Sequence, residues 1–169
     1  IIYRKEFEEA ASEFEAYLND RGIKWYAENL DDILSNSTWS GADIPERIRK
    51  CVISYYWNCS ITHVIIFGDA DPDDFPSDAN LPSYVVDKNW EIPIRYVYNP
   101  DYASWIDRYM TGINGSFTPT DLYYASCSSY YSWDDDNDGY YGESPYYCAC
   151  GYDEVDWYPE VAVSRVPAR

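Results

Sequence analysis

Apolar positions three and four residues apart predict a helix over residues 3–20, with glutamates on the opposite face. A second helix is predicted over 43–57, because Asp43 is a suitable N-cap and Pro45 stands in the first turn. Between these two helices, residues 31–34 are expected to form a single helical turn.

Runs of β-branched and aromatic residues predict the strands. Residues 62–69 form a continuous run of this kind, which is typical of a strand buried on both faces of a parallel sheet. Further strands or extended segments are expected at 23–27, 92–98, 120–125 and 157–166. The order of helices and strands predicts an α/β fold whose mainly parallel sheet is flanked by helices. No repeat or linker divides the chain, so residues 1–169 are expected to form a single α/β domain.

The chain is strongly acidic, with 12 Lys and Arg against 30 Asp and Glu and a net charge of −18. Such a chain repels nucleic-acid phosphates and anionic lipids, so we expect no nucleic-acid partner, and a cation suits it better as a ligand. An apolar content of 46% excludes a disordered chain. No apolar run approaches the ~18 residues of a membrane span.

Tyrosine dominates the aromatic residues, with 20 Tyr and 7 Trp against 5 Phe. Tyr packs as an apolar side chain while its hydroxyl reaches water, so a core that is open to solvent on one side would explain the surplus of tyrosine. An interaction surface is the alternative, because Tyr and Trp are common at interfaces. The chain begins with Ile-Ile and ends after Arg169, and we expect it to be a piece of a longer protein.

The five cysteines include no C-x-x-C pair, so a structural zinc site is not expected. Several cysteines, strong acidity and three N-x-Ser/Thr sequons favour an extracellular or cell-surface glycoprotein with disulfides. Cys51 and Cys59 are predicted to be bonded, or at least close, because the chain is expected to reverse between them. Cys127 is expected to pair with Cys148 or Cys150. The sequons begin at Asn36, Asn58 and Asn114.

An acidic motif stands inside the polar segment 126–153, which is too long for a bare connection and needs a disulfide or a metal to organise it. Asp134, Asp136 and Asp138 occupy alternate positions and Gly139 follows, as in the opening of a calcium-binding loop. Ca²⁺ binds about six to eight oxygen ligands, and alternating carboxylates in a tight turn can converge on one ion. The spacing therefore predicts a Ca²⁺ site.

Two further ligands are predicted for this ion, the backbone carbonyl of Tyr140 and the carboxylate of Glu143. The loop departs from an EF-hand, because Pro145 stands where the twelfth-position glutamate would be. A solvated acidic turn is the alternative, although its carboxylates would repel one another unless a cation neutralised them. A later acidic group could cap a turn or complete the cation site, and it comprises Asp153, Glu154 and Asp156.

No catalytic residue is predicted. A Cys-His or Ser-His-Asp arrangement would need His63, the only histidine, which opens a strand expected to be buried and is interpreted as a structural side chain. Asp69 and Asp71 follow that strand at its carboxyl edge, where α/β sheets place functional groups. They are interpreted either as a functional pair or as a turn-forming pair.

Three stretches, in this order, resemble the gingipain-type cysteine peptidases, a caspase-like clan. Residues 63–70 resemble that family's strand ending in V-G-D-A, and residues 119–125 resemble the segment before its Asp/Gly loop. Residues 153–168 resemble the pattern D-E-x-D-x-Y-P-E-V-x-V-G-R-x-P, with Ser164 in place of the usual glycine. The resemblance covers most of the chain.

This resemblance implies a caspase-like half domain, the first subdomain of a catalytic domain. In that family the catalytic His, in a G-H-G context, and the catalytic Cys follow the R-x-P motif, so neither is in this chain. The chain alone is therefore expected to be inactive. Its implied partners are the downstream catalytic subdomain of the same precursor and, in the full enzyme, a peptide whose carbonyl a thiolate attacks.

Two functions are compatible with these observations. The first is the non-catalytic N-terminal subdomain of a secreted gingipain-like cysteine peptidase, stabilised by Ca²⁺. The second is a peptidase-like domain reused as a calcium-dependent extracellular structural or adhesive module that self-assembles, which the Tyr surplus and the sequons favour. A glycan-binding domain is a weaker third reading, because no aromatic spacing is diagnostic.

Overall fold

The structure of this protein is a computed structural model that describes residues 1–70, 91–98, 117–128, 130–137, 139, 141–142 and 153–167. In this part of the chain, four strands form a parallel sheet of order β2-β1-β3-β6. Their bounds are β1 (Ile2–Tyr3), β2 (Glu28–Asn29), β3 (His63–Phe67) and β6 (Ala162–Val166). A separate antiparallel pair consists of β4 (Arg95–Tyr98) and β5 (Phe117–Thr120). The predicted α/β fold with a mainly parallel sheet is confirmed.

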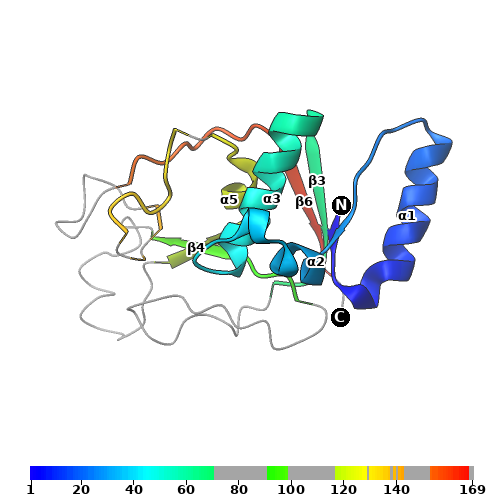
Figure 1. Ribbon diagram of the computed structural model, residues 1–169, viewed down its shortest axis with the longest axis horizontal. Coiled ribbons are helices and arrows are strands. Elements are labelled where there is room, and N and C mark those ends of the chain that lie inside the picture. Colours follow the sequence, from blue (N-terminus) through cyan, green and yellow to red (C-terminus); the bar gives the residue numbers. More distant parts are fainter. Residues whose placement is uncertain are drawn as a thin grey trace.

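Helices flank the sheet on both faces, with α1 (Glu8–Asp20) on one side and α3 (Ile44–Cys59) on the other (Figure 1). The side chain of Asp43 accepts a hydrogen bond from the Glu46 N–H at 2.9 Å, and Pro45 lies in the first turn, as expected for the start of α3. α2 (Leu30–Ser35) extends the predicted helical turn. Two 3₁₀ segments complete this half, η1 (Lys5–Phe7) and η2 (Ser37–Trp39).

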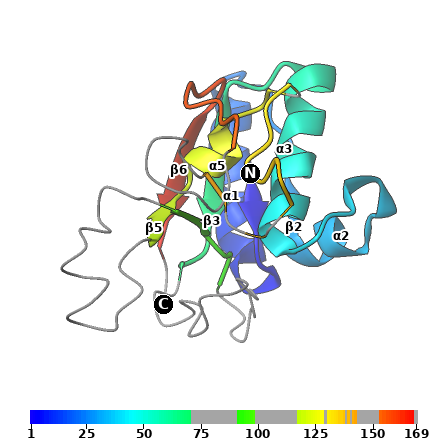
Figure 2. The same cartoon turned by 90° about the vertical axis from the view of Figure 1, so that its left-hand side faces the viewer.

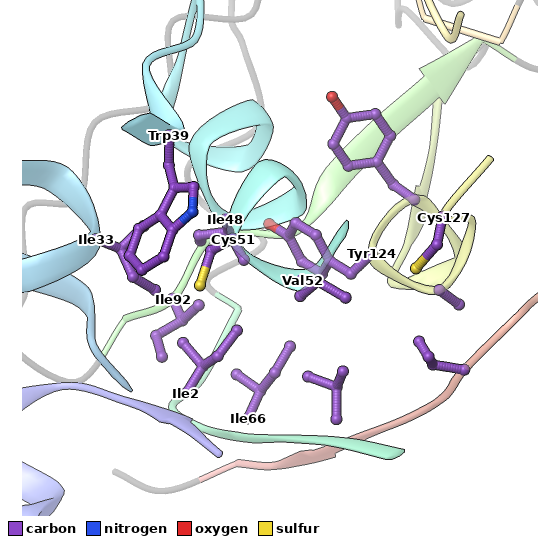
Figure 3. Close-up of a cluster of buried hydrophobic side chains, with 14 of the residues drawn as sticks. Ile2, Ile33, Trp39, Ile48, Cys51, Val52, Ile66, Ile92, Tyr124 and Cys127 are labelled. Carbon is purple, nitrogen blue, oxygen red and sulfur yellow. The ribbon is translucent and has the colours of Figure 1, made fainter. Parts of the chain in front are cut away.

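The core lies between α3 and the sheet (Figure 3). Ile48 and Val52 of α3 pack with Ile2 of β1 and Ile66 of β3, and all four are buried. Burial along β3 alternates, so one face of the strand is tightly covered while the other, which meets α1, is half-buried. The expectation of a strand buried on both faces is therefore only partly right. His63 is exposed, so its interpretation as a buried structural side chain is wrong.

The second half of the chain joins the same core through α5 (Leu122–Ala125), which packs against α3 and β6 (Figure 2). A strand or extended segment was expected here, and the helix is a correction. Thr120 Oγ1 accepts a hydrogen bond from the Leu122 N–H at 3.0 Å, which starts the turn, and burial of Tyr123 and Tyr124 outweighs their β-propensity. α5 leads directly into the acidic loop.

One other expectation fails. Residues 23–27 form no strand, and pairing with β1 begins only at Glu28. No strand was predicted for residues 117–119, where β5 begins. None of the helices in the described part of the chain has the length and apolarity that crossing a bilayer requires.

The predicted Cys51–Cys59 disulfide is wrong, because both thiols are free. α3 continues through Cys59, so the chain does not reverse between them. Eight residues in one helix rise by about 12 Å, which exceeds the ~7 Å limit for a disulfide. Cys127 is a free, buried thiol as well, contrary to the expected pairing, and the partners proposed for it, Cys148 and Cys150, lie outside the described residues.

Candidate metal centre

The acidic loop is anchored by Trp133, which is buried beneath it. Its ring packs edge-on against Tyr123 of α5, with centroids 5.4 Å apart, and against Trp157 at 5.3 Å. Aromatic pairs in this geometry bury large apolar areas and fix the direction of the chain. The next residue, Asp134, is therefore held at the surface directly above the core.

Left-handed backbone conformations close the loop. Asn137, Gly139 and Gly142 have φ values of 60°, 87° and 80°, a region that favours glycine and tolerates asparagine. The Gly142 N–H donates to the carbonyl of Trp133 at 2.8 Å, and the Gly139 N–H donates to Asp134 Oδ1 at 3.3 Å. The chain thus coils back on itself, as the alternating aspartates require if they are to share one ion.

Asp153 ties the loop to the segment that precedes β6. Its side chain is only 4% exposed, and its two oxygens accept from opposite sides of the loop. Oδ1 accepts from the Asp135 N–H at 2.6 Å and Oδ2 accepts from the Gly142 N–H at 2.8 Å. Hydrogen bonds to a charged acceptor are about twice as strong as neutral ones. Asp153 therefore orders the loop whether or not an ion is bound.

Three carboxylates meet at this point. Asp134, Asp136 and Asp153 each place one oxygen so that all three oxygens lie within 4.8 Å of one another. Ligands on a Ca²⁺ sphere of about 2.3–2.6 Å radius are at most about 5 Å apart, so this spacing fits one shared ion. An all-oxygen set suits Ca²⁺ and does not suit zinc, which prefers Cys and His.

Two of the predicted ligands are therefore brought together, while ion binding stays a prediction. Asp134 and Asp136 converge as expected, whereas Asp138, Tyr140 and Glu143 lie outside the described residues. Asp153 joins the group, which is one of the two roles left open for the later acidic residues. Asp153 is far along the chain from Asp134 and Asp136, so no local pattern indicated that the three would meet. Only its place in the later acidic group pointed to a role in the site.

A buried guanidinium packs against the acidic loop from the core side. Arg95 of β4 donates to both carboxylate oxygens of Asp43, at 2.7 and 2.8 Å, and to the Tyr123 hydroxyl at 3.2 Å. Its guanidinium carbon lies 3.6 Å from the centroid of the Tyr141 ring, which belongs to the loop. Burial raises the pKa values of Tyr123 and Tyr141. Sequence reasoning missed Arg95, because a lone arginine in a strand gives no signal of burial.

No catalytic pair is present in the described part of the chain. The His63 ring bonds to the Thr62 hydroxyl through Nδ1 at 2.9 Å, and no described cysteine is hydrogen-bonded to it. Burial raises the pKa of both the Cys51 and the Cys127 thiols to about 12, so neither is a thiolate at neutral pH. Asp69 forms an isolated parallel β-bridge with Glu91, and its side chain accepts a hydrogen bond from the Ala70 N–H at 2.9 Å. Asp71 lies outside the described residues.

The family model described as Peptidase family C25 matches residues 1–169, the whole chain. The chain belongs to peptidase family C25. This is the gingipain family, so the resemblance of the three sequence stretches is confirmed. Searches of curated proteins and of solved structures give no match.

In this C25 chain, the polar residues of the family-like stretches hold segments together. Arg165 binds both oxygens of Asp121, at 2.7 and 3.0 Å, and donates to the Ile92 carbonyl at 2.6 Å. Glu160 accepts from the Cys127 N–H at 2.5 Å. Together with Asp153, these side chains join β6 and the segment before it to α5 and the loop, which is a structural use.

Proposed function

We propose that this chain is the non-catalytic N-terminal subdomain of a secreted, gingipain-like cysteine peptidase, stabilised by Ca²⁺. The single observation that carries the non-catalytic role is the position of His63. It is exposed at the amino end of β3, whereas parallel sheets form their sites at the carboxyl ends of the strands. Cysteine-peptidase chemistry needs a histidine within hydrogen-bond reach of a reactive thiol, and the Cys51 and Cys127 thiols stay protonated.

A downstream catalytic subdomain would pack beside β6. Among the described residues β6 pairs only with β3, so its other side is an edge of the sheet. Ala162, Ser164 and Val166 are exposed on the same strand. An edge strand with small and apolar residues is suited to contact another subdomain.

The test is to express the segment that the gene encodes after Arg169, joined to this chain and alone. The proposal expects a G-H-G sequence and a later strand cysteine in that segment, and thiol-dependent peptide cleavage only by the joined protein. Absence of both motifs, with an inactive joined protein, would favour the alternative of a reused structural or adhesive module. The exposed side chains of Tyr130 and Tyr158 are the observation that favours that alternative.

Calcium would be held by Asp134, Asp136 and Asp153, with Asp138, Glu143 and the Tyr140 carbonyl as the remaining predicted ligands. The ion would supply charge neutralisation for carboxylates that otherwise repel one another. Bound Ca²⁺ at 100 times its Kd should add about 2.7 kcal/mol to the free energy of unfolding. This stabilisation should disappear with a chelator.

The calcium experiment compares two variants of equal charge. Asp134→Asn/Asp136→Asn removes two ligands, whereas Glu9→Gln/Glu13→Gln removes two exposed carboxylates from α1. Calorimetric titration with CaCl₂ should show one site in the native protein and the α1 variant, and none in the loop variant. Equal titration of all three proteins would mean that Ca²⁺ binds the acidic surface in general.

Secretion is supported by the acidity and the sequons, whereas the three described cysteines form no disulfide. The acidity remains, and Asn58 of one sequon is exposed on α3. Intact cells treated with a protease provide the test. We expect the protein to be found at the surface or in the medium, and protection inside the cell would contradict the proposal.

A further inference from the structure

The buried ring of Tyr141 joins the acidic loop to strand β4. Its centroid lies 3.6 Å from the guanidinium carbon of Arg95, and its edge meets the Tyr123 ring with centroids 6.1 Å apart. The same guanidinium carbon lies 4.4 Å from the centroid of the Tyr123 ring. A guanidinium attracts an aromatic face more strongly when both are removed from water, as they are here. Arg95 therefore fixes the position of residue 141.

The next residue, Gly142, is held by β4 as well. Val97 lies two residues after Arg95, on the same face of the strand, and its side chain is 3.3 Å from the place a Cβ on Gly142 would take. The Gly142 N–H donates to the Trp133 carbonyl and to Asp153 Oδ2, both at 2.8 Å. Packing against β4 thus sets the direction of this N–H.

The direction of the Gly142 N–H matters because it orients the carboxylate of Asp153. Oδ2 accepts from Gly142, and Oδ1 accepts from the Asp135 N–H at 2.6 Å. A carboxylate oxygen has two lone pairs, so it can accept a hydrogen bond and still bind a cation. Groups that bond to a metal ligand tune the affinity of the site without touching the ion.

We propose that Arg95 is a positioning residue for the candidate metal centre: its stack on Tyr141 directs the Gly142 N–H at Asp153 and so aims that carboxylate at the cation. This inference rests on the proposed Ca²⁺ site and adds a residue that does not touch the ion. The positive charge of Arg95 by itself opposes binding of a cation. A favourable effect of Arg95 on affinity therefore comes from geometry.

The first experiment is calorimetric titration of Tyr141→Leu with CaCl₂. The substitution removes the stacked ring and leaves the net charge unchanged, and it should raise the Kd for Ca²⁺ by about 10–100-fold. Tyr17→Leu is the matched control, because it removes a ring that stacks on Arg21 at 3.5 Å in and beside α1, and it should change the Kd less than about twofold. Tyr141→Phe keeps the ring and should retain the native affinity.

A second variant removes the other half of the stack. Arg95→Lys keeps the positive charge beside Asp43 but lacks the planar group that stacks on Tyr141. It should weaken Ca²⁺ binding in the same direction as Tyr141→Leu. If circular dichroism shows that Tyr141→Leu does not fold, Arg95→Lys carries the comparison.

The luminescence of bound Tb³⁺ distinguishes positioning from a general loss of stability. Trp133 directly precedes Asp134 and can sensitise the ion, and lifetimes in H₂O and D₂O count the water molecules bound to it. At saturation, Tyr141→Leu should hold about one more water than the native protein, because Asp153 no longer supplies its oxygen. A merely structural role would weaken binding without adding a water.

The outcomes separate this inference from the calcium proposal. A native protein that binds no Ca²⁺ would contradict the calcium proposal, and the positioning role would fail with it. Native binding together with an unchanged Kd in Tyr141→Leu, or with an unchanged number of bound waters, would overturn the positioning role alone. Amide exchange in EDTA adds a test without the ion: the Gly142 N–H should exchange faster in Tyr141→Leu than in Tyr17→Leu, and equal rates would contradict the role given to the stack.

Discussion

The buried ion pair between Arg95 and Asp43 provides the sharpest stability test of this fold. The Asp43 carboxylate binds the fully buried guanidinium with both oxygens, at 2.7 and 2.8 Å, and also caps α3. Arg95 in turn stacks on Tyr141 of the acidic loop. One carboxylate therefore links β4, the start of α3 and the loop.

Asp43→Ala removes both roles at once. Loss of one partner from a buried pair costs about 3–5 kcal/mol, because the other charge stays buried without compensation. Loss of the N-cap costs about 1 kcal/mol more. The sum, about 4–6 kcal/mol, is a large part of the ~5–15 kcal/mol that stabilises a domain. Asp43→Asn keeps Oδ1 for the cap but loses the charge and replaces the Oδ2 acceptor of Arg95 Nη1 with an NH₂ donor, so we expect a loss of about 2–3 kcal/mol.

The control is Asp31→Ala, which breaks the ion pair of Arg4 with Asp31. That pair is longer, at 3.3 Å, and the Asp31 side chain is 63% exposed, so its loss should cost about 0–1 kcal/mol. Urea unfolding followed by circular dichroism and tryptophan fluorescence gives all three values. If Asp43→Ala and Asp43→Asn both fall within 1 kcal/mol of Asp31→Ala, the ion pair does not have the energetic role described.

Two further predictions concern the thiols and the loop. Burial raises the pKa of Cys51 to about 12, so the unfolded chain loses the thiol proton at a lower pH than the folded chain does. The stability that comes from keeping this thiol protonated is therefore complete below about pH 8.5. Above that pH the free energy of unfolding falls by about 1.4 kcal/mol per pH unit. Urea unfolding between pH 8 and pH 10 should show a shallower decline in Cys51→Ala, and parallel curves would refute the burial. Gly142→Ala should lose more stability than Gly22→Ala. Both glycines have a left-handed conformation, which costs an alanine about 1–2 kcal/mol. Only at Gly142 would the added Cβ also lie close to a neighbour, at 3.3 Å from Val97. Equal losses would show that the loop does not pack on β4 as closely as described.

The elements with strong local signals could be predicted from the sequence. α3 has an N-cap, a first-turn proline and an apolar stripe, and β3 has a continuous β-branched run. The end of α3 was misjudged because it stops at Ser60, which adopts a left-handed conformation (φ 55°) without the glycine that usually signals it. That error of two residues produced the false disulfide.

Elements that depend on distant partners could not be predicted. β1 and β2 have two residues each, too few for any periodicity, and they exist because β1 pairs with both β2 and β3. α5 has tyrosines with strand propensity, and its helical form follows from burial against α3 and β6. In α5 packing overrides local propensity, and in β1 and β2 strand pairing creates elements for which the local sequence has no signal.

The candidate metal centre also has a part that could be predicted from the sequence and a part that could not. The alternate spacing of Asp134 and Asp136 is a local pattern and was readable, whereas the approach of Asp153 depends on how the segment before β6 returns to the loop. The exposure of His63 depends likewise on where the sheet ends. Both features come from tertiary structure, which local sequence patterns do not reveal.

The proposal that this C25 chain carries no catalytic chemistry of its own is tested most directly by assaying the purified 169-residue chain on a peptide library, with and without a reducing agent. The account predicts no cleavage above buffer and no labelling by an active-site-directed thiol probe. His63→Ala and Cys59→Ala variants, purified in parallel, identify any contaminating protease. Thiol-dependent cleavage that disappears in either variant would contradict the account, because it would place a working Cys-His pair inside this chain.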